Sequence, residues 1–200
     1  MKEDLKISNT FRLVAGFAII IGMATFAYGF FTEPDRTWAN YLLNNYYWLS
    51  IALGGAFFFA LQYISQSGWS AAFKRIPEAF MAYLPYAAVF FLFLYFGTHS
   101  LYHWSHSEEV AHDALLQHKA PYLNIPFFMA RLVLYFSLWI IFTQILRRLS
   151  LKEDESGERK YFEKQELYSK ILIFIIAISF TFSNFDWIMS MDPHWFSTIF

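Results

Sequence analysis

Residues 13–31 read LVAGFAIIIGMATFAYGFF, and none of these side chains is charged. A helix advances about 1.5 Å per residue, so roughly 20 apolar residues cross the hydrocarbon core of a bilayer. Lys2, Lys6 and Arg12 precede the run, as basic residues do in a signal peptide, but no small-residue cleavage site follows it. We therefore predict that residues 13–31 form an uncleaved first membrane span.

Further apolar runs of similar length follow at 47–65, 79–97, 127–146 and 171–189. Backbone amides that face lipid must be paired within their own segment, so each run is predicted to be a helix; strands of a β-barrel are too short to explain such runs. The chain is 57% hydrophobic and 22% aromatic, with its charges confined to short segments, unlike a soluble domain. The predicted fold class is all-α, a polytopic transmembrane helix bundle with about five spans forming one domain over residues 1–200.

The basic residues are distributed unevenly between the two sides of the membrane. Twelve of the fifteen lie before the first span, between the second and third, or between the fourth and fifth: Lys2, Lys6, Arg12, Lys74, Arg75, Arg147, Arg148, Lys152, Arg159, Lys160, Lys164 and Lys170. The other side has Arg36, Lys119 and Arg131. This asymmetry predicts that the basic side and the N-terminus are cytoplasmic. The segment 150–169, which mixes both signs of charge, is predicted to be a solvated cytoplasmic loop.

Residues 98–126 form the longest predicted extracytoplasmic connection and hold five of the six histidines: His99, His103, His106, His112 and His118. His99, His103 and His106 are spaced i, i+4, i+7, so they share one face if the stretch is helical. That spacing permits a metal site, but it fits an interfacial polar face equally well, and we assign no metal ligand. The chain has no cysteine, which excludes thiolate-bound zinc and iron–sulfur clusters.

Membrane b-type haem is usually held by imidazoles inside spanning helices, and none of the predicted spans has a histidine in its middle. No haem is therefore expected in this chain.

Two ionisable residues fall inside predicted spans. Arg131 lies about five residues inside the extracytoplasmic end of the fourth span, and Asp186 lies at a similar distance inside that end of the fifth. Consecutive antiparallel helices place both groups at one depth, where an ionised group is costly unless it is paired or wetted. We expect the two to pair, either as a salt bridge that orients the helices or as part of a quinone- or proton-handling site.

Asp192, Pro193 and His194 follow at the membrane surface. A carboxylate and an imidazole there are suited to relaying protons or to hydrogen-bonding a quinone carbonyl. Asp192 followed by Pro193 also has the pattern of an N-cap, and we interpret Asp192 as the cap of a sixth helix while His194 stays open. Because residues 195–200 are again apolar, we expect the sequence to be the front part of a longer protein.

The cytoplasmic ends of the spans offer weaker candidates for the other half of a proton route: Glu78 and Tyr83 in the third span, and Thr143 and Gln144 in the fourth. Pro85, about one turn into the third span, is predicted to kink that helix or to free a carbonyl for another partner.

Two stretches resemble a known family. LYHWSHSEEVAHDALLQHKAPYLNIPFFMAR (Leu101 to Arg131) and FSNFDWIMSMDPHWFSTIF (Phe182 to Phe200) are similar to the second quinone-binding-type membrane subunit of bacterial alternative complex III. That complex is a quinol:cytochrome c oxidoreductase unrelated to the cytochrome bc1 complex. The subunit belongs to the polytopic family typified by the membrane anchors of polysulfide and nitrite reductases.

The resemblance implies a multi-pass protein of a bacterial inner membrane. Its implied partners are a homologous membrane subunit, an iron–sulfur subunit and c-type cytochrome subunits, with haem and iron–sulfur clusters on those partners and no covalently bound cofactor here. It implies a menaquinol site near the extracytoplasmic surface, where Arg131, Asp186 and His194 fall. The lipid bilayer is the expected environment, and no nucleic acid partner is expected.

Three hypotheses follow for the function. The first is a subunit that binds quinol or moves its protons, and the second is a structural scaffold of the same complex without a quinone site. A secondary transporter ranks third, because the Gly/Pro-interrupted helix pairs that often build midplane sites are missing.

Overall fold

The computed structural model describes residues 8–195, and within that range it contains helices and short connections but no strand. In chain order the elements are α1 (Asn9–Thr32), α2 (Pro34–Ile64), η1 (Gly68–Ala72), α3 (Arg75–Met81), α4 (Leu84–Leu92), η2 (Phe93–Gly97), α5 (Thr98–Leu101), η3 (His103–Ser105), α6 (Ser107–His112), α7 (Ala114–Lys119), α8 (Ile125–Ser156), α9 (Arg159–Trp187) and η4 (Met189–Met191).

Five helical stretches among these residues are long and apolar enough to cross a membrane: Asn9–Thr32, Pro34–Ile64, Arg75–Leu101, Ile125–Ser156 and Arg159–Met191. The predicted all-α class with five spans is confirmed. The architecture is that of a multi-pass membrane protein.

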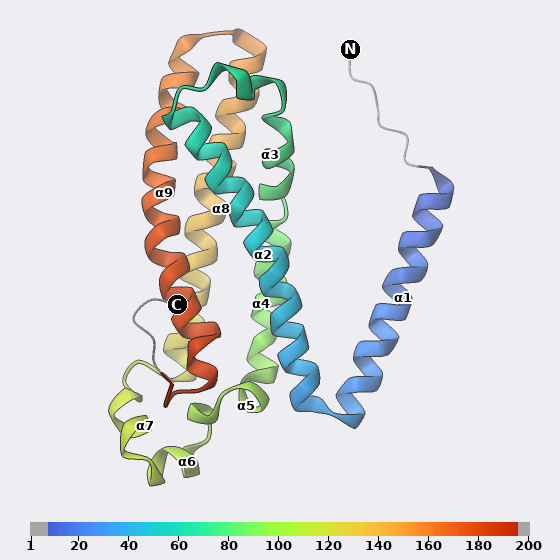
Figure 1. The fold of residues 1–200 in the computed structure, drawn as a ribbon, viewed down its shortest axis with the longest axis vertical. Coiled ribbons are helices and arrows are strands. Elements are labelled where there is room, and N and C mark those ends of the chain that lie inside the picture. Colours follow the sequence, from blue (N-terminus) through green and yellow to red (C-terminus); the bar gives the residue numbers. More distant parts are fainter. Residues whose placement is uncertain (1–7, 196–200) are drawn as a thin grey trace.

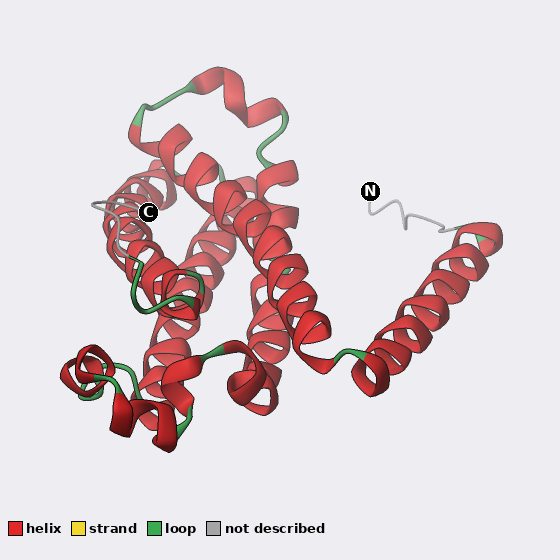
Figure 2. Ribbon diagram, turned by 60° about the horizontal axis from the view of Figure 1, so that its bottom comes forward, coloured by secondary structure: helices red, strands yellow, loops and turns green. Residues whose placement is uncertain are grey.

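Helices α2, α3–α4, α8 and α9 form an antiparallel bundle, with α8 and α9 side by side (Figures 1 and 2). Aromatic rings fill its interior. The ring centroids of Phe91 and Trp187 are 4.5 Å apart and those of Phe136 and Trp139 are 5.2 Å apart, and all four side chains are buried. Tilted and edge-on contacts of this kind favour a closely packed apolar core.

The α8–α9 hairpin turns at Gly157, which adopts a left-handed conformation (φ 65°) and donates its N–H to the carbonyl of Glu153 at 2.8 Å. A residue without Cβ takes this conformation at little cost and so ends α8 sharply. The tight turn keeps the two long helices antiparallel. As a result Arg131 and Asp186, far from the turn on either side, reach the same level.

The segment predicted as a loop at 150–169 is helical except for residues 157–158. Ion pairs one turn apart stabilise the charged helix ends where they project beyond the apolar middle: Arg159 pairs with Glu163 at 3.2 Å and Lys170 with Glu166 at 2.7 Å. The loop prediction was wrong because charge content separates solvent from lipid but does not separate loop from helix.

Helices α2 and α3 approach closely at Gly55. A Cβ atom built there would lie 2.8 Å from the Cβ of Phe80 and 3.1 Å from the carbonyl oxygen of Pro77. Small residues allow backbones in membranes to come this near, so Gly55 sets the distance between the two helices.

The third span is interrupted. Helix α3 ends at Met81 and α4 begins at Leu84, with Tyr83 donating its N–H to the carbonyl of Phe80 at 3.1 Å. Pro85 lies in the first turn of α4, where its missing N–H is tolerated. The kink predicted at Pro85 is therefore present as a break between two short helices.

Helix α1 lies apart from the bundle and has no buried residue (Figure 1). It meets α2 near their shared turn, where Phe26 and Phe30 contact Trp38 at ring-centroid distances of 6.1 and 5.8 Å. Lys2 and Lys6, used above to orient the chain, lie outside the described residues.

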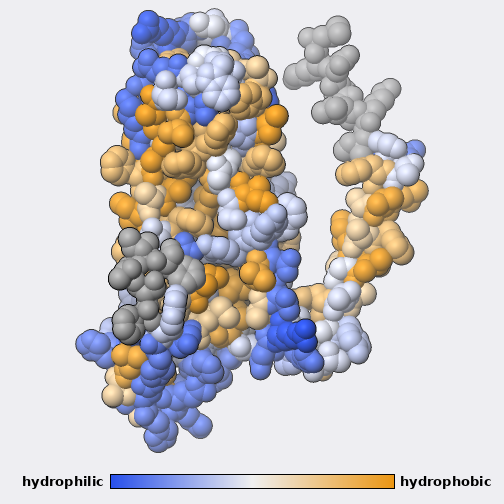
Figure 3. All heavy atoms as spheres, viewed as in Figure 1, coloured by the Kyte–Doolittle hydropathy of each residue, from blue (hydrophilic) through white to orange (hydrophobic). Residues whose placement is uncertain are grey.

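The two ends of the bundle differ in chemistry. We call the end formed by residues 65–75 and 147–170 the basic end, and the end formed by residues 98–124 the His-rich end. Figure 3 shows hydrophobic surface along the bundle and α1, with hydrophilic surface at both ends. This pattern is typical of a protein whose middle faces lipid.

Candidate functional site

Arg131 on α8 and Asp186 on α9 form a bidentate ion pair. The guanidinium donates from Nε to Oδ2 and from Nη2 to Oδ1, both at 2.8 Å. Arg131 is 6% exposed and Asp186 is fully buried. The pairing expected from their common depth is therefore present. Parallel N–H···O bonds of this kind are among the strongest polar contacts in proteins.

The pair is enclosed by residues that sequence reasoning did not identify. Tyr135 donates its hydroxyl to Asp186 Oδ2 at 2.9 Å, and Arg131 Nη1 donates to the carbonyl of Tyr122 at 3.0 Å. The guanidinium also lies over the rings of Tyr122 and Phe127, 3.9 and 4.3 Å from their centroids. Tyr135 stands four residues after Arg131 on the same helix face, which is a signal that could have revealed it.

The hydroxyl of Tyr122 is buried and meets no hydrogen-bond partner among residues 8–195. Burial, together with the charge of Asp186, raises the pKa of Tyr122 to about 12, so the phenol keeps its proton at neutral pH. Buried hydroxyls are nearly always paired with protein, water or a ligand. The Tyr122 hydroxyl thus lies close to Asp186 and Tyr135 but makes no hydrogen bond of ordinary geometry to a described residue, which leaves it able to donate to a further group.

Two indole N–H groups near the ion pair, Trp104 Nε1 and Trp187 Nε1, are also buried without a partner among the described residues. Together with Tyr102 and Tyr135 they form an aromatic cluster beside the pair. Tyr102 links the two: its ring stacks on Trp104 at 5.0 Å and its hydroxyl donates to the carbonyl of Trp187 at 3.0 Å. Trp187 in turn contacts Tyr135 at a ring-centroid distance of 6.2 Å. The cluster thus combines flat apolar rings with several free donors.

His194 is held by the His-rich end. Its Nε2 lies 2.6 Å from Asp113 Oδ2, and Lys119 Nζ donates to the carbonyl of Pro193 at 2.6 Å. Asp113 also caps α7 by accepting the N–H groups of Leu115 and Leu116 at 2.8 and 3.3 Å. Partial desolvation opposes ionisation, but these N–H groups and His194 outweigh it and hold the pKa of Asp113 below its usual value.

Asp192 has capping geometry, because its Oδ1 accepts the N–H groups of His194 and Trp195 at 3.2 and 3.3 Å. This agrees with the N-cap interpretation. The sixth helix that it would begin falls on residues 196–200, which lie outside the described residues.

A cleft of about 500 Å³ opens between the His-rich end and the end of α9. Its walls carry two imidazoles and three carboxylates among the lining residues His103, Glu109, Asp113, Leu116, Met191, Asp192, Pro193 and His194.

His99, His103 and His106 do not share a helix face. The helix breaks at Tyr102, which has extended backbone angles, so the condition for the i, i+4, i+7 face is not met. His106 Nε2 lies 2.8 Å from the carbonyl of His99, whereas His103 Nδ1 lies 3.1 Å from Glu109. No three His, Asp or Glu side chains in residues 8–195 are placed to hold a metal ion.

The four candidates toward the basic end have separate environments. Glu78 is buried, with Oε2 paired to Arg75. Thr143 donates its hydroxyl to the carbonyl of Trp139 in its own helix at 2.7 Å. Tyr83 and Gln144 are half-buried.

Sequence reasoning missed the polar neighbours of Glu78. Four buried atoms in this half of the bundle lack a partner among the described residues: Glu78 Oε1, Ser150 Oγ, Gln165 Oε1 and Ser169 Oγ. Glu153 beside them accepts from Tyr63 at 2.8 Å and from Gln165 at 3.0 Å. Such unpaired buried atoms mark positions where internal water is expected.

No protein-family model matches the chain, and no curated protein matches it significantly.

Proposed function

We propose that this protein is an integral membrane subunit of a quinol:electron-acceptor (cytochrome c) oxidoreductase complex, and that it contributes to quinol binding or proton transfer at the Arg131–Asp186 cluster. The observation that carries the proposal is the buried, unpartnered hydroxyl of Tyr122 beside a buried ion pair. An ion pair that only orients two helices requires no additional free donor. A quinone carbonyl or a proton-carrying water would use one.

The chemistry of the cluster suits a quinol. Oxidation of a quinol to a quinone releases two protons and two electrons, and the electrons would pass to metal centres on neighbouring subunits. Asp186 supplies an acceptor for a quinol hydroxyl, while Tyr122 supplies a donor for a carbonyl oxygen. The flat rings of Tyr102 and Trp104 provide the apolar walls that such sites use.

The unpartnered polar atoms around Glu78 and Ser150 support a proton route toward the opposite end. Between them and Asp186 the interior carries further hydroxyl groups, among them Ser179, which accepts a hydrogen bond from Trp139 Nε1 at 2.7 Å. Internal water at the unpaired atoms would connect these groups.

The membrane and the partners belong to the same proposal. Nine Lys and Arg residues gather at the basic end, which supports a cytoplasmic location for that end and for the N-terminus. The membrane would be a bacterial inner membrane. The partners would be a homologous membrane subunit, an iron–sulfur subunit and c-type cytochromes.

The experiment is Tyr122→Phe, made in the native complex purified through this chain. Removing a buried hydroxyl that makes no hydrogen bond of ordinary geometry to a described residue should change stability little. Loss of one hydrogen bond in the transition state should lower quinol turnover by about tenfold. Tyr168→Phe is the matched control, because Tyr168 is a half-buried tyrosine whose ring contacts Phe142 away from the cluster.

Turnover and haem content per chain are the two readouts. Reduced turnover in Tyr122→Phe at unchanged haem content supports the proposal. Equal turnover in both variants would assign the cluster to the alternative role, a scaffold that binds no quinone.

A further inference from the structure

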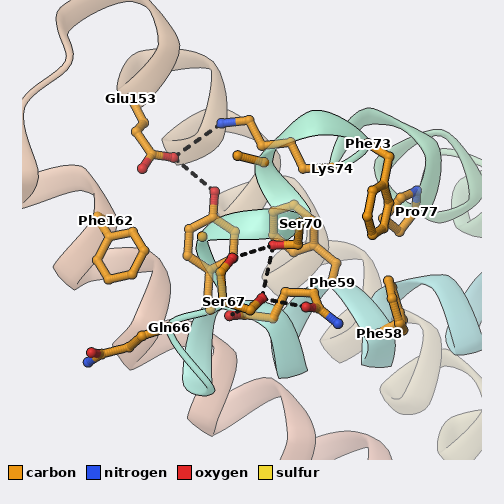
Figure 4. Close-up of a pocket in the computed structure, with 14 residues that line it drawn as sticks. Phe58, Phe59, Gln66, Ser67, Ser70, Phe73, Lys74, Pro77, Glu153 and Phe162 are labelled. Atoms are coloured by element: carbon orange, nitrogen blue, oxygen red, sulfur yellow. Dashed lines mark hydrogen bonds and ion pairs between the residues drawn. The ribbon is translucent and has the colours of Figure 1, made fainter.

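A second cavity, of about 120 Å³, lies at the basic end of the bundle. It forms because α2 ends at Ile64 and Gln66 takes a positive φ of 52°, which turns residues 67–73 back over the last turns of α2. The cavity is lined by α2, the returning segment, α3 and the charged ends of α8 and α9 (Figure 4), and its walls include Phe58, Tyr63, Phe73, Lys74, Glu153 and Phe162.

Aromatic rings make its apolar walls. Figure 4 shows Phe162 on one side and Phe73 on the other. Phe162 packs on Tyr63 at a ring-centroid distance of 5.4 Å, and Phe73 stacks on Phe58 at 6.1 Å. Walls of this kind favour a flat, apolar occupant.

The polar side of the cavity offers an acceptor but no free cation. Lys74 Nζ is 2.5 Å from Asp154 Oδ1 and 3.3 Å from Glu153 Oε2, so two carboxylates neutralise its charge. Tyr63 and Gln165 donate to the same Oε2 of Glu153, which leaves Oε1 without a bond to a described residue. This arrangement disfavours a phosphate and suits a neutral group that donates a hydrogen bond.

The serine hydroxyl groups that line the cavity bond to neighbouring protein groups. Ser67 donates to Gln62 Oε1 at 2.5 Å, and Ser70 donates to the carbonyl of Ser67 at 2.8 Å. These two bonds hold the returning segment closed over the cavity.

The apolar side of the cavity reaches the outer surface of the bundle. Phe58 is 38% exposed, and Trp69, which contacts Phe73 at 5.3 Å, is 67% exposed. Both are large apolar side chains on a surface that faces lipid or its headgroup boundary, where Trp is enriched. A tail attached to an occupant would therefore leave toward the bilayer.

From these features we propose that the cavity binds the ring of a neutral, lipid-soluble hydroxylated aromatic of the phenol or quinol class. The ring lies between the walls formed by Phe162 and Phe73, its hydroxyl donates to Glu153 Oε1, and its tail passes Phe58. Glu153 stands 22 residues from Arg131 along α8, a distance of about 33 Å. The cavity is thus a separate binding site, and it does not depend on the function proposed for the Arg131–Asp186 cluster.

The test is a fluorescence titration of the full chain in lipid nanodiscs with 2-heptyl-4-hydroxyquinoline N-oxide, a fluorescent hydroxylated ring with an alkyl tail. Empty nanodiscs measure partition into lipid. Ala71→Trp fills the cavity and should abolish saturable binding, whereas Ala72→Trp, at an exposed neighbour that does not line the cavity, should retain it.

Glu153→Gln should weaken binding by about tenfold, because a hydrogen bond to a charged acceptor is replaced by a neutral one. Glu155→Gln, an exposed carboxylate nearby, should leave affinity unchanged. Because Ala71 is an exposed residue at the edge of the cavity, Ala71→Trp keeps the test decisive if Glu153→Gln disturbs folding.

Absence of saturable binding to the wild type would overturn the proposal, as would equal affinity in Ala71→Trp and Ala72→Trp. Binding that is lost in Tyr122→Phe but kept in Ala71→Trp would place the ligand at the other end of the bundle. That result would also overturn this site while supporting the function proposed for the Arg131–Asp186 cluster.

Discussion

Replacing Asp186 by Asn removes the charge that compensates Arg131 in the interior of the bundle. Asp186 accepts two N–H···O bonds of 2.8 Å from Arg131 and the hydroxyl of Tyr135; Asn keeps only one acceptor oxygen and presents an NH2 donor group in place of the other. Arg131 keeps its charge at 6% exposure, with the carbonyl and ring of Tyr122 and the ring of Phe127 as its other described contacts.

The expected cost follows from that geometry. Removing one partner of a buried, hydrogen-bonded ion pair lowers the free energy of unfolding by about 3–5 kcal/mol. For a chain of this size each kcal/mol shifts Tm by about 2–4 °C, so Asp186→Asn should lower Tm by about 6–20 °C. The double replacement Arg131→Met with Asp186→Met removes both charges and should recover most of this loss.

Thermal unfolding in one detergent, followed by circular dichroism, provides the measurement. Glu163→Gln is the control, because it breaks the exposed pair with Arg159 and should leave Tm nearly unchanged. An Asp186→Asn variant that unfolds within about 2 °C of the wild type, or a double variant less stable than the single one, would show that the buried pair does not carry this cost.

Three further predictions concern packing, pH and orientation. Gly55→Val should lower stability by about 1–3 kcal/mol, because its Cβ meets Phe80, whereas Gly54→Val, with open space around its Cβ, should not; Tm values of the two variants decide this. The pKa of Asp113 is lowered by folding, so its contribution is complete above the unfolded pKa of 3.8 and is lost as pH falls through the folded value. The Tm difference between wild type and Asp113→Asn should accordingly persist at neutral pH and shrink as the pH falls below 3.8; a difference that does not shrink in acid contradicts this prediction. Alkaline phosphatase fused after His112 should be active and the same fusion after Gly157 inactive, whereas the reverse pattern would invert the proposed orientation.

The spans could be predicted from the sequence because a lipid environment imposes a local rule: each apolar run must pair its own backbone. The residues at which the helices begin and end could not be predicted in this way. Helix α2 begins at Pro34, well before residue 47, where the apolar run starts. Asn40 and Asn44 in the added segment bond to carbonyls one turn earlier, at 2.9 and 2.8 Å, and hydropathy does not register such helical contacts.

The candidate site could likewise be predicted only in part. Arg131 and Asp186 could be paired from the sequence, because depth in antiparallel helices depends only on residue number. Tyr122 lies in the connection before α8, and its place over the guanidinium depends on how residues 98–124 fold. The i, i+4, i+7 spacing of His99, His103 and His106 would put them on one helix face only if the helix ran through all three. The helix ends at Tyr102, so the spacing does not bring them together.

Membership in a respiratory quinol-oxidising complex can be tested by purifying the native membrane complex through a tag on this chain, followed by haem staining, quinone extraction and a quinol oxidation assay. We expect c-type haem subunits and quinone to co-purify, and deletion of this chain to abolish quinol oxidation. Recovery of the chain alone, without haem or quinol activity, would contradict this membership.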